Sequence, residues 1–439
     1  MVDNEAKSTP TPETPPDQPA PAPPTGISGA SAVEPKRGVP WSDRIRRALR
    51  ALVLPLLAVF SALVVGAFVI VFSDPEVLGL FFTDPVAAIG TAWGSVAGAY
   101  GALFRGSIGD PVQIFNAIAS LDLAQIKAAA RPISETLLSS TPLILTGLSV
   151  ALAFRAGLFN IGGEGQLQIG ALSAAIVGFS LVGQPWFIHL PLALLAGAVG
   201  GALWGFIPGV LKARTGAHEV ITTIMLNFVA FRVVDLALKT PGIQRPGRSD
   251  PISKVIEPSA QLNSIIDGLR VHWGLVIALL AALFISWLLF RSTKGFEFRA
   301  VGLNPQAARY AGMSISRTLV LTMMTAGALA GLAGSIVVLG VTRTLSPGLA
   351  GGAGFDGIAI ALLGRARPLG VVAAAILVGA LRAGSTPMQA ATGVPLHLVT
   401  IIQALIIMFI AAPALVRAIY RIRAERMVGA EAFAKGWGA

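Results

Sequence analysis

Long apolar segments alternate with short polar or basic segments along the chain from residue 51 to residue 418. Most apolar segments approach the roughly 20 residues that a helix needs to cross a bilayer. We therefore predict an all-α integral membrane protein with about ten transmembrane helices. The predicted spans are Ala51–Phe72, Ile133–Phe154, Gly165–Val182, Phe187–Leu211, Val220–Leu238, Trp273–Phe290, Thr318–Gly340, Phe355–Leu363, Gly370–Leu381 and Leu398–Ala418.

Three stretches depart from this pattern. Phe355–Leu363 and Gly370–Leu381 are short for a membrane span, which predicts short or broken helices. Val86–Phe104 is long enough to cross, but it is rich in Gly and Ala and is bounded by acidic residues and a proline. We interpret it as a helix on the outer surface or a re-entrant element.

Basic residues set the predicted orientation, because Lys and Arg concentrate on the cytoplasmic side. The basic segment Trp41–Arg50 precedes the first span and places the amino terminus inside. The segments that then become cytoplasmic all carry Lys or Arg: Arg155–Glu164, Lys212–Glu219, Arg291–Arg317, Arg365–Arg367 and Arg417–Arg426. The predicted external loop Lys239–Arg270 also carries five basic residues, an exception that long loops often make. Both termini are therefore predicted to be cytoplasmic.

The segment Met1–Pro40 differs in composition from the rest of the chain. It is rich in Pro, Thr, Ala and Gly, so it cannot bury enough apolar surface to offset the entropy of ordering. We predict a disordered, Pro-rich cytoplasmic tail at 1–40, a transmembrane domain at 41–426 and a second cytoplasmic tail at 427–439.

Composition supports a membrane protein and argues against other classes. Charged residues make up 13% of the chain, about half the share in a soluble domain. The 33 Lys and Arg exceed the 22 Asp and Glu, but they gather at span ends, so we predict lipid rather than nucleic acid as the partner. Without cysteine, disulfides and thiolate metal sites are excluded.

No pattern for nucleotide hydrolysis or metal catalysis occurs. The chain contains neither GxxxxGK[ST] nor HExxH, and its four histidines fall singly at span ends. We predict that the chain is not an enzyme and holds no metal. If transport uses ATP, another chain must hydrolyse it.

Polar residues at membrane depth are the main functional candidates, because they are costly there. In FNIGGEGQLQIG, repeated glycine weakens a helix and can expose peptide groups beside Glu164 and Gln166 to a polar solute. The alternative is that Glu164 interacts with a helix N-terminus, and that Asn227 only bonds a neighbouring helix. The candidate solute-path residues are Phe159, Asn160, Glu164, Gln166, Asn227, Phe355, Asp356 and Gln403.

Two short motifs indicate an internal duplication. Gly163-Glu164-Gly165 opens one predicted span from inside, and Gly354-Phe355-Asp356-Gly357 opens another from outside. In both, glycines flank an acidic residue just before an apolar helix. Inverted repeats with broken helices are a common transporter plan, so we take an inverted repeat as a hypothesis.

The segment Arg291–Arg317 carries its own small helix. Asn304 is a good N-cap, Pro305 suits the first helical position, and Gly312 suits the left-handed position that ends a helix. Between them Gln306–Ala311 forms barely two turns, too short to be stable alone. A capped helix of this size between two spans is typical of a docking element, although an ordinary basic loop is the alternative.

Four motifs in one order resemble the permease subunits of bacterial ABC importers. They are GLFNIGGEGQLQIGA (Gly157–Ala171), HEVITTIMLNFVA (His218–Ala230), FRAVGLNPQAARYAGM (Phe298–Met313) and FDGIAIALLGRARPLG (Phe355–Gly370). More narrowly, they resemble the branch related to ribose and branched-chain amino-acid permeases that serves simple sugars and, above all, nucleosides. The resemblance covers roughly Leu52–Arg421.

The resemblance implies that the small helix is a coupling helix seated on an ATP-binding subunit. The residues that carry this role are Asn304, Pro305, Ala307, Ala308, Arg309 and Gly312. Gln306 replaces the usual leading Glu of that loop. The resemblance also implies a second permease subunit, an extracytoplasmic substrate-binding lipoprotein, and ATP and Mg bound by the partner ATPase rather than by this chain.

We predict from these features a plasma-membrane permease subunit that imports a small molecule, a nucleoside first and a pentose as the alternative. The alternative from a different class of transporter is a secondary transporter driven by an ion gradient, in which Glu164 or Asp356 carries a proton. Such a carrier would work without an ATPase, which separates the two hypotheses.

Overall fold

The computed structural model describes residues 41–421, so the tails predicted at 1–40 and 427–439 lie outside the described residues. The chain divides into two units, Met1–Ala51 and Leu52–Ala439. Within the described residues the fold is helical, and the β pairing there is limited to two isolated bridges, Gln244 with Ser253 and Ser264 with His272. This confirms the predicted all-α class.

The helices follow one another with short connections in most places. The amino-terminal helices are α1 (Trp41–Phe72), α2 (Pro75–Thr83), α3 (Pro85–Ile108), α4 (Pro111–Ser120) and α5 (Leu123–Arg155). The central ones are α6 (Gly163–Ser180), α7 (Trp186–Thr215), α8 (Glu219–Leu238), the 3₁₀ turn η1 (Pro258–Ala260), α9 (Gly274–Arg291), α10 (Thr293–Leu303) and α11 (Pro305–Tyr310). The last are α12 (Ile315–Ile336), the π-helical segment η2 (Val337–Thr342), α13 (Ala353–Leu363), α14 (Pro368–Thr392), α15 (Leu396–Ala411) and α16 (Pro413–Ile419).

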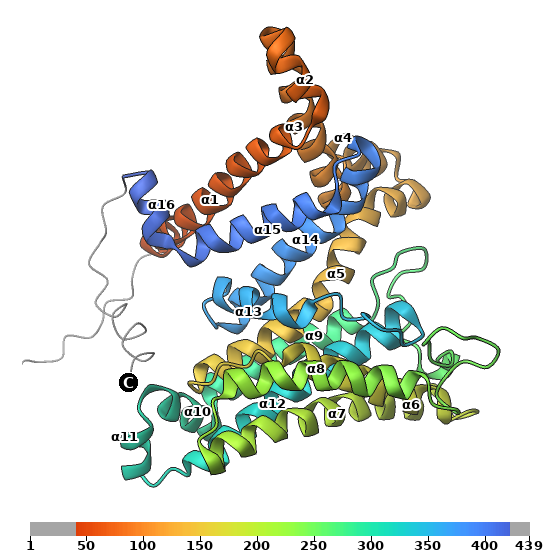
Figure 1. Cartoon of the computed structure of the whole chain (residues 1–439), viewed down its shortest axis with the longest axis vertical. Helices are drawn as coiled ribbons and strands as arrows, with labels where there is room; N and C mark the ends of the chain where they lie inside the picture. The colour runs from red at the N-terminus through yellow and green to blue at the C-terminus, as the bar shows by residue number, and fades with distance from the viewer. Residues whose placement is uncertain (1–40, 422–439) are drawn as a thin grey trace, which may run out of the picture. The chain divides into compact units, whose positions relative to one another are not determined.

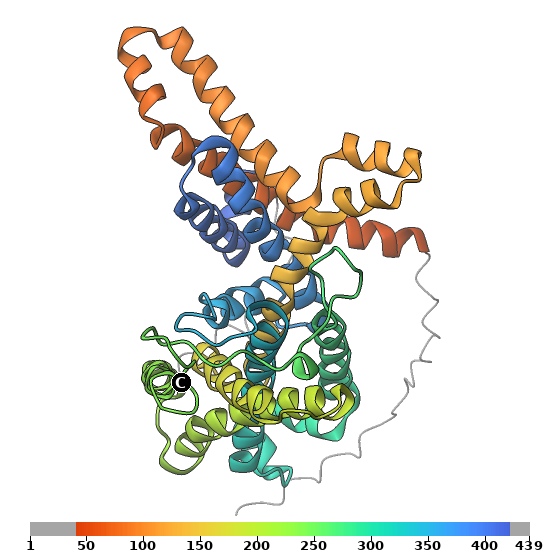
Figure 2. The same ribbon diagram turned by 90° about the vertical axis from the view of Figure 1, so that its right-hand side faces the viewer.

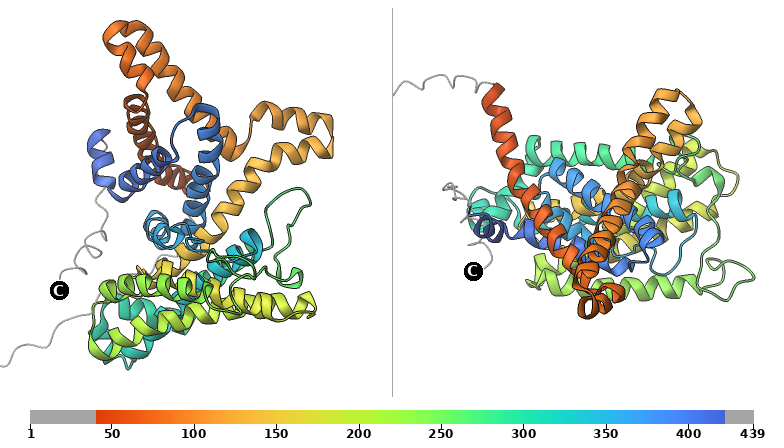
Figure 3. Two further views of the ribbon diagram at one scale, coloured as in Figure 1. Left: turned by 45° about the vertical axis from the view of Figure 1, so that its right-hand side comes forward. Right: turned by 90° about the horizontal axis from the view of Figure 1, so that it is seen from above.

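Helices α6, α7 and α12 lie side by side, and α5 packs against α12, α13 and α14 (Figures 1 and 3). Leu143, Leu145 and Leu148 of α5 are fully buried in this core. Small residues let the backbones approach, as membrane helices require. A Cβ atom on Gly170 of α6 would lie 2.2 Å from the Cα of Gly331 in α12, so glycine is needed at this crossing.

A second apolar cluster joins α1, α3, α14, α15 and α16, with Ala62, Leu103, Ile402 and Val416 among its buried residues. Helix α3 packs along α14 (Figure 2), and a Cβ on Gly384 would lie 2.3 Å from the carbonyl oxygen of Leu103. Helix α4 lies beside the first turns of α5 in Figures 2 and 3.

By length and composition, seven described helical stretches can cross a membrane, or eight if α1 and α2, bent by 74°, form one span. The predicted number was about ten. The difference arises partly because α13 and α15 are apolar but short. Helix α6 is also not among the seven, since its glycine-rich, polar start lowers its mean hydropathy.

Three predicted segments have different bounds in the structure. Val86–Phe104 belongs to the continuous helix α3, which is long and apolar enough to cross. The span predicted at Gly370–Leu381 continues as α14 to Thr392, because the charged Arg382 lies within the helix rather than at its end. The span predicted at Leu398–Ala418 breaks between α15 and α16, where Pro413 begins the second helix.

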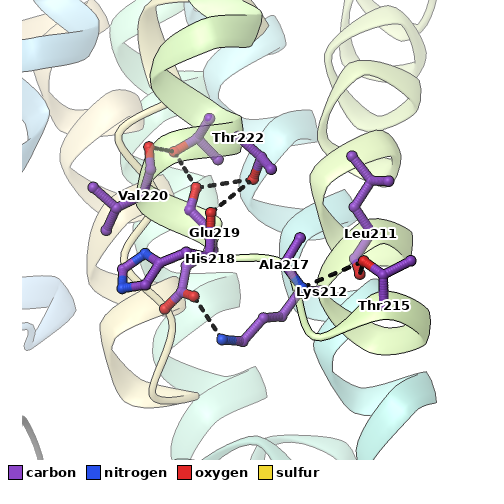
Figure 4. A network of polar contacts seen from close by, with 9 residues as sticks. Leu211, Lys212, Thr215, Ala217, His218, Glu219, Val220 and Thr222 are labelled. Atoms are coloured by element: carbon purple, nitrogen blue, oxygen red, sulfur yellow. Dashed lines mark hydrogen bonds and ion pairs between the residues drawn. The ribbon is translucent and has the colours of Figure 1, made fainter.

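Different contacts hold the two ends of the bundle. At one end the loop between α8 and α9 is tied down by hydrogen bonds from Glu257 to Gly178 and from Leu262 to Leu339. At the other end Lys212 of α7 forms a 2.9 Å ion pair with Glu219 at the start of α8 (Figure 4). Since α9 runs from the loop to Arg291, α10 and α11 lie at the end opposite the loop.

Candidate functional site

Helices α6 and α13 meet at their N-termini. Oε2 of Glu164, in the first turn of α6, accepts a 2.8 Å hydrogen bond from the amide of Gly354 in the first turn of α13. A Cβ on Gly354 would lie 2.2 Å from the amide nitrogen of Glu164, so the two backbones are in direct contact. The residue Glu164 is 4% exposed. The two Gly/acid motifs of the sequence therefore come together, and the acid of one caps the helix of the other.

Asn160 and Gln166 brace the segment that leads into α6. Their side-chain amides exchange two hydrogen bonds, 2.9 Å from Asn160 Nδ2 to Gln166 Oε1 and 3.2 Å in the reverse direction. Asn160 Oδ1 also accepts from the amide of Gly162 at 3.1 Å. Both side chains are buried, and these bonds hold the glycine-rich start of α6 in place.

Asn227 caps α6 from a different helix. Its Oδ1 accepts a 2.8 Å bond from the amide of Gly165, and its Nδ2 donates a 2.9 Å bond to the carbonyl of Ile161. Asn227 lies in α8 and is 1% exposed. One side chain thus satisfies a free donor of α6 and an acceptor just before it. This matches the alternative in which Asn227 bonds a neighbouring helix.

Asp356 and Gln403 also come together, joined by a residue that the sequence did not single out. Arg382 of α14 forms an ion pair with Asp356 Oδ2, and Gln403 Nε2 of α15 donates to the same oxygen at 3.2 Å. Arg382 also donates to the carbonyl of Gly351 at 3.3 Å. The sequence signal for Arg382 is a lone charge directly after the apolar stretch Gly370–Leu381.

The two clusters are neighbours. Glu164 bonds the amide of Gly354, which lies two residues before Asp356 in the first turn of α13. Together they place two carboxylates and one guanidinium around the start of α13. Charged groups at membrane depth are normally paired or line a polar path, so this junction is the strongest candidate for the solute path.

The two predicted aromatic residues differ in exposure. Phe159 is half-buried, and its ring lies 5.0 Å from the ring of Phe154. Phe355, between Gly354 and Asp356, is 43% exposed. Phe355 is therefore the more exposed of the two rings, whereas Phe159 packs against Phe154.

Helix α11 has the caps that the sequence predicts. Asn304 Oδ1 accepts a 3.0 Å bond from the amide of Ala307, Pro305 is the first helical residue, and Gly312 has φ of +79°. The amides of Gly312 and Met313 donate hydrogen bonds to the carbonyls of Arg309 and Ala308, respectively. This pair of hydrogen bonds is typical of a Schellman motif. These bonds stabilise a helix of only 6 residues.

The faces of α11 differ in exposure. Tyr310 is 92% exposed, and Asn304, Pro305, Ala307, Arg309 and Gly312 are exposed as well. Ala308, by contrast, is 3% exposed and packs on its own chain. A charge at Ala308 would therefore disturb the fold of this chain before it affected a partner.

No three His, Asp or Glu side chains among the described residues are grouped to hold a metal ion. The polar groups described above are carboxylates, amides and one guanidinium. They can orient a polar, uncharged solute by hydrogen bonds, and they contain no arrangement for covalent chemistry.

Residues 133–411 match the family model described as branched-chain amino acid transport system / permease component. The chain belongs to this permease family. The matched region contains α6, α8, α11 and α13, so both the junction and the capped helix are part of the permease body. The family and the apolar helices make the protein a multi-pass membrane protein.

Curated relatives of this permease are subunits of transporters. It is 40% identical to the guanosine ABC transporter permease protein of Bacillus subtilis, over 84% of this chain and 95% of that protein. It is 40% identical to a nucleoside ABC transporter permease protein of Lactococcus lactis, over 64% of this chain and 80% of that protein. A glucose ABC transporter permease protein of Haloferax volcanii is 38% identical over 63% of this chain and 75% of that protein. No solved structure gave a significant match.

Proposed function

We propose that the protein is a membrane-spanning subunit of an ABC importer that carries nucleosides across the plasma membrane. The observation that carries this proposal is the 40% identity that extends over 95% of a guanosine ABC transporter permease protein. The partly exposed carboxylate of Asp356 at the start of α13 suits the hydroxyl and amine donors of a nucleoside.

Energy for transport comes from a partner chain in this proposal. An ATP-binding subunit holds ATP and Mg, a second permease subunit completes the path, and an extracytoplasmic lipoprotein delivers the solute. Helix α11 suits contact with the ATPase, because it is short, doubly capped and exposes Tyr310 and Arg309. Movement of the ATPase is then transmitted through α11 to α10 and α12.

In the proposed orientation α11 faces the cytoplasm, and the loop between α8 and α9 faces outside. The cations at the α11 end, including Arg155, Lys212, Arg291 and Arg317, support this orientation. Both termini are proposed to be cytoplasmic.

A simple sugar is the second candidate solute. The relative with 38% identity is a glucose ABC transporter permease protein, so the same scaffold serves a monosaccharide in another protein. A nucleoside adds a flat base to the sugar, and Phe355 offers an exposed ring for stacking.

An uptake assay in cells with and without this chain tests the proposal. The labelled solutes are guanosine, adenosine, uridine, ribose and glucose. We expect chain-dependent nucleoside uptake that survives collapse of the proton gradient and disappears when the ATPase subunit is deleted. Uptake of ribose or glucose without nucleoside uptake would change the proposed substrate from a nucleoside to a simple sugar. Nucleoside uptake that is lost with the gradient and is independent of the ATPase would identify an ion-coupled carrier instead.

A further inference from the structure

A groove of about 710 Å³ lies where α9, α10 and α12 come together, beside the turn that follows α11. Its walls are the last turn of α9, the first two turns of α10, and the first turns of α12. The groove is separate from the polar cluster at the α6–α13 junction.

The groove is strongly basic. Arg291, Lys294, Arg299 and Arg317 line it, and Glu297 is the one acidic residue among the lining residues. Glu297 is paired with Lys294 at 2.9 Å, whereas Arg291 and Arg317 have no ion-pair partner among the described residues. Several cations held together repel one another, so the groove favours an anion.

The helices that open into the groove do not reduce this positive charge. Helices α10 and α12 both begin there, after Ser292 and Ser314, and neither has an acidic residue in its first turn. The partial positive charges of their N-termini add to the charges of the basic side chains.

An exposed apolar stripe runs along α9 to the groove. Leu280, Phe284 and Trp287 are 58%, 53% and 53% exposed and share one face of the helix, because they are spaced by four and three residues. Phe290, 44% exposed, ends the stripe and lines the groove. Helix α9 is long and apolar enough to cross the membrane, so its last turn lies at the depth of lipid head groups.

We propose that the groove binds the phosphate of an anionic phospholipid, with an acyl chain lying along the exposed face of α9. The unpaired Arg291 and Arg317 contact the phosphate, and Leu280, Phe284 and Trp287 contact the chain. A free phosphate ion would use the cations but not the stripe, and a zwitterionic lipid would use the stripe but leave the excess positive charge unmatched.

Native mass spectrometry of the full-length protein in detergent, with added phosphatidylglycerol or phosphatidylcholine, tests the proposal without a transport assay. We expect retention of phosphatidylglycerol and little phosphatidylcholine. Each removed cation is expected to weaken binding about fivefold, so Arg291→Gln with Arg317→Gln should weaken it about 25-fold. Both side chains are exposed, and gel filtration verifies that the variant is folded.

The matched control removes two arginines from the loop at the opposite end of α9, with Arg245→Gln and Arg248→Gln. This control should retain phosphatidylglycerol like the natural protein. Equal retention of the two lipids would overturn the proposal, as would equal loss in the control. Displacement of the lipid by excess glycerol phosphate, which lacks acyl chains, would show that the stripe has no part in binding.

Discussion

At the scale of single residues, two buried polar side chains of this permease cap helices to which they do not belong. Asn227 of α8 serves the start of α6, and Glu164 of α6 serves the start of α13. A free amide at a buried helix end is costly, so these side chains contribute to stability even where they also face a solute.

Glu164 allows the two roles to be separated. Glu164→Gln keeps an oxygen that can accept from Gly354, so we expect thermal stability in detergent to change little. Glu164→Ala leaves that amide without a partner and should lower the free energy of unfolding by about 1–3 kcal/mol. If the charge itself acts on the solute, Glu164→Gln will raise the KM of nucleoside uptake. An unchanged KM would restrict Glu164 to its capping role.

The ion pair of Asp356 and Arg382 is suited to a double-mutant cycle. Both side chains are partly buried, at 23% and 31% exposure, so removal of either leaves an unmatched charge at membrane depth. We expect Arg382→Gln and Asp356→Asn each to lower stability by about 1–3 kcal/mol, and the double variant to lose less than the sum. Additive losses in thermal unfolding would show that the pair is not coupled.

At the scale of elements, predictions made from local chemistry were accurate and predictions that depended on distant contacts were not. The bounds of α11 follow from Asn304, Pro305 and Gly312, because caps act within a few residues. The predicted end of α14 at Leu381 was wrong. Arg382 lies inside the helix because its charge is paired with Asp356, 26 residues away in sequence. That the two Gly/acid motifs touch each other could not be read from either motif alone.

Helix α11 offers a test of coupling at its exposed face. Tyr310→Ala should leave the fold intact, since Tyr310 is 92% exposed. If Tyr310 anchors the ATPase, we expect a loss of about 1–2 kcal/mol in docking free energy, about tenfold in affinity, measured by co-purification of the two subunits. Ala308→Asp, at a buried position, should instead reduce insertion and yield. Full association of Tyr310→Ala with the ATPase would remove this residue from the interface.

The crossing of α7 and α12 offers a test of close packing. Gly331→Ala places a methyl group 2.3 Å from the carbonyl oxygen of Gly197, so helices must move apart. We expect a loss of about 1–3 kcal/mol in thermal unfolding. Gly94→Ala, in a helix with open space around that position, should gain about 0.5–1 kcal/mol. Similar effects from both substitutions would contradict the packing argument.

At the scale of the whole molecule, the arrangement of α5 to α9 fixes which segments share an end of the bundle. Arg155, Lys212 and Arg291 lie in the last turns of the alternate helices α5, α7 and α9 on one side, and the loop between α8 and α9 lies on the other. The distribution of charge alone could suggest which segments share an end, because Lys and Arg concentrate on the cytoplasmic side of a membrane protein. Whether α3 crosses depends on length and environment together, so the sequence left that open.

Single cysteines test the crossing, because the natural chain has none. Leu121, between α4 and α5, is 83% exposed and is predicted to lie outside. If only one of α1 and α3 crosses, Ser8→Cys should be labelled by a membrane-impermeant maleimide only in opened cells, and Leu121→Cys in intact cells. Labelling of both in intact cells would show that α1 and α3 both cross. Arg248→Cys and Tyr310→Cys serve as the outside and inside references.

The contact between α6 and α13 has a mechanical consequence. Separation of the two helix N-termini would break the hydrogen bond from Gly354 to Glu164. It would also expose the backbones of the two helices, which are in direct contact there. A transport cycle that opened this point would lose those bonds at every turnover. We therefore expect the contact to act as a fulcrum that keeps its shape while the helices around it tilt. Cross-linking across it should leave transport intact, whereas cross-linking between moving helices should stop it.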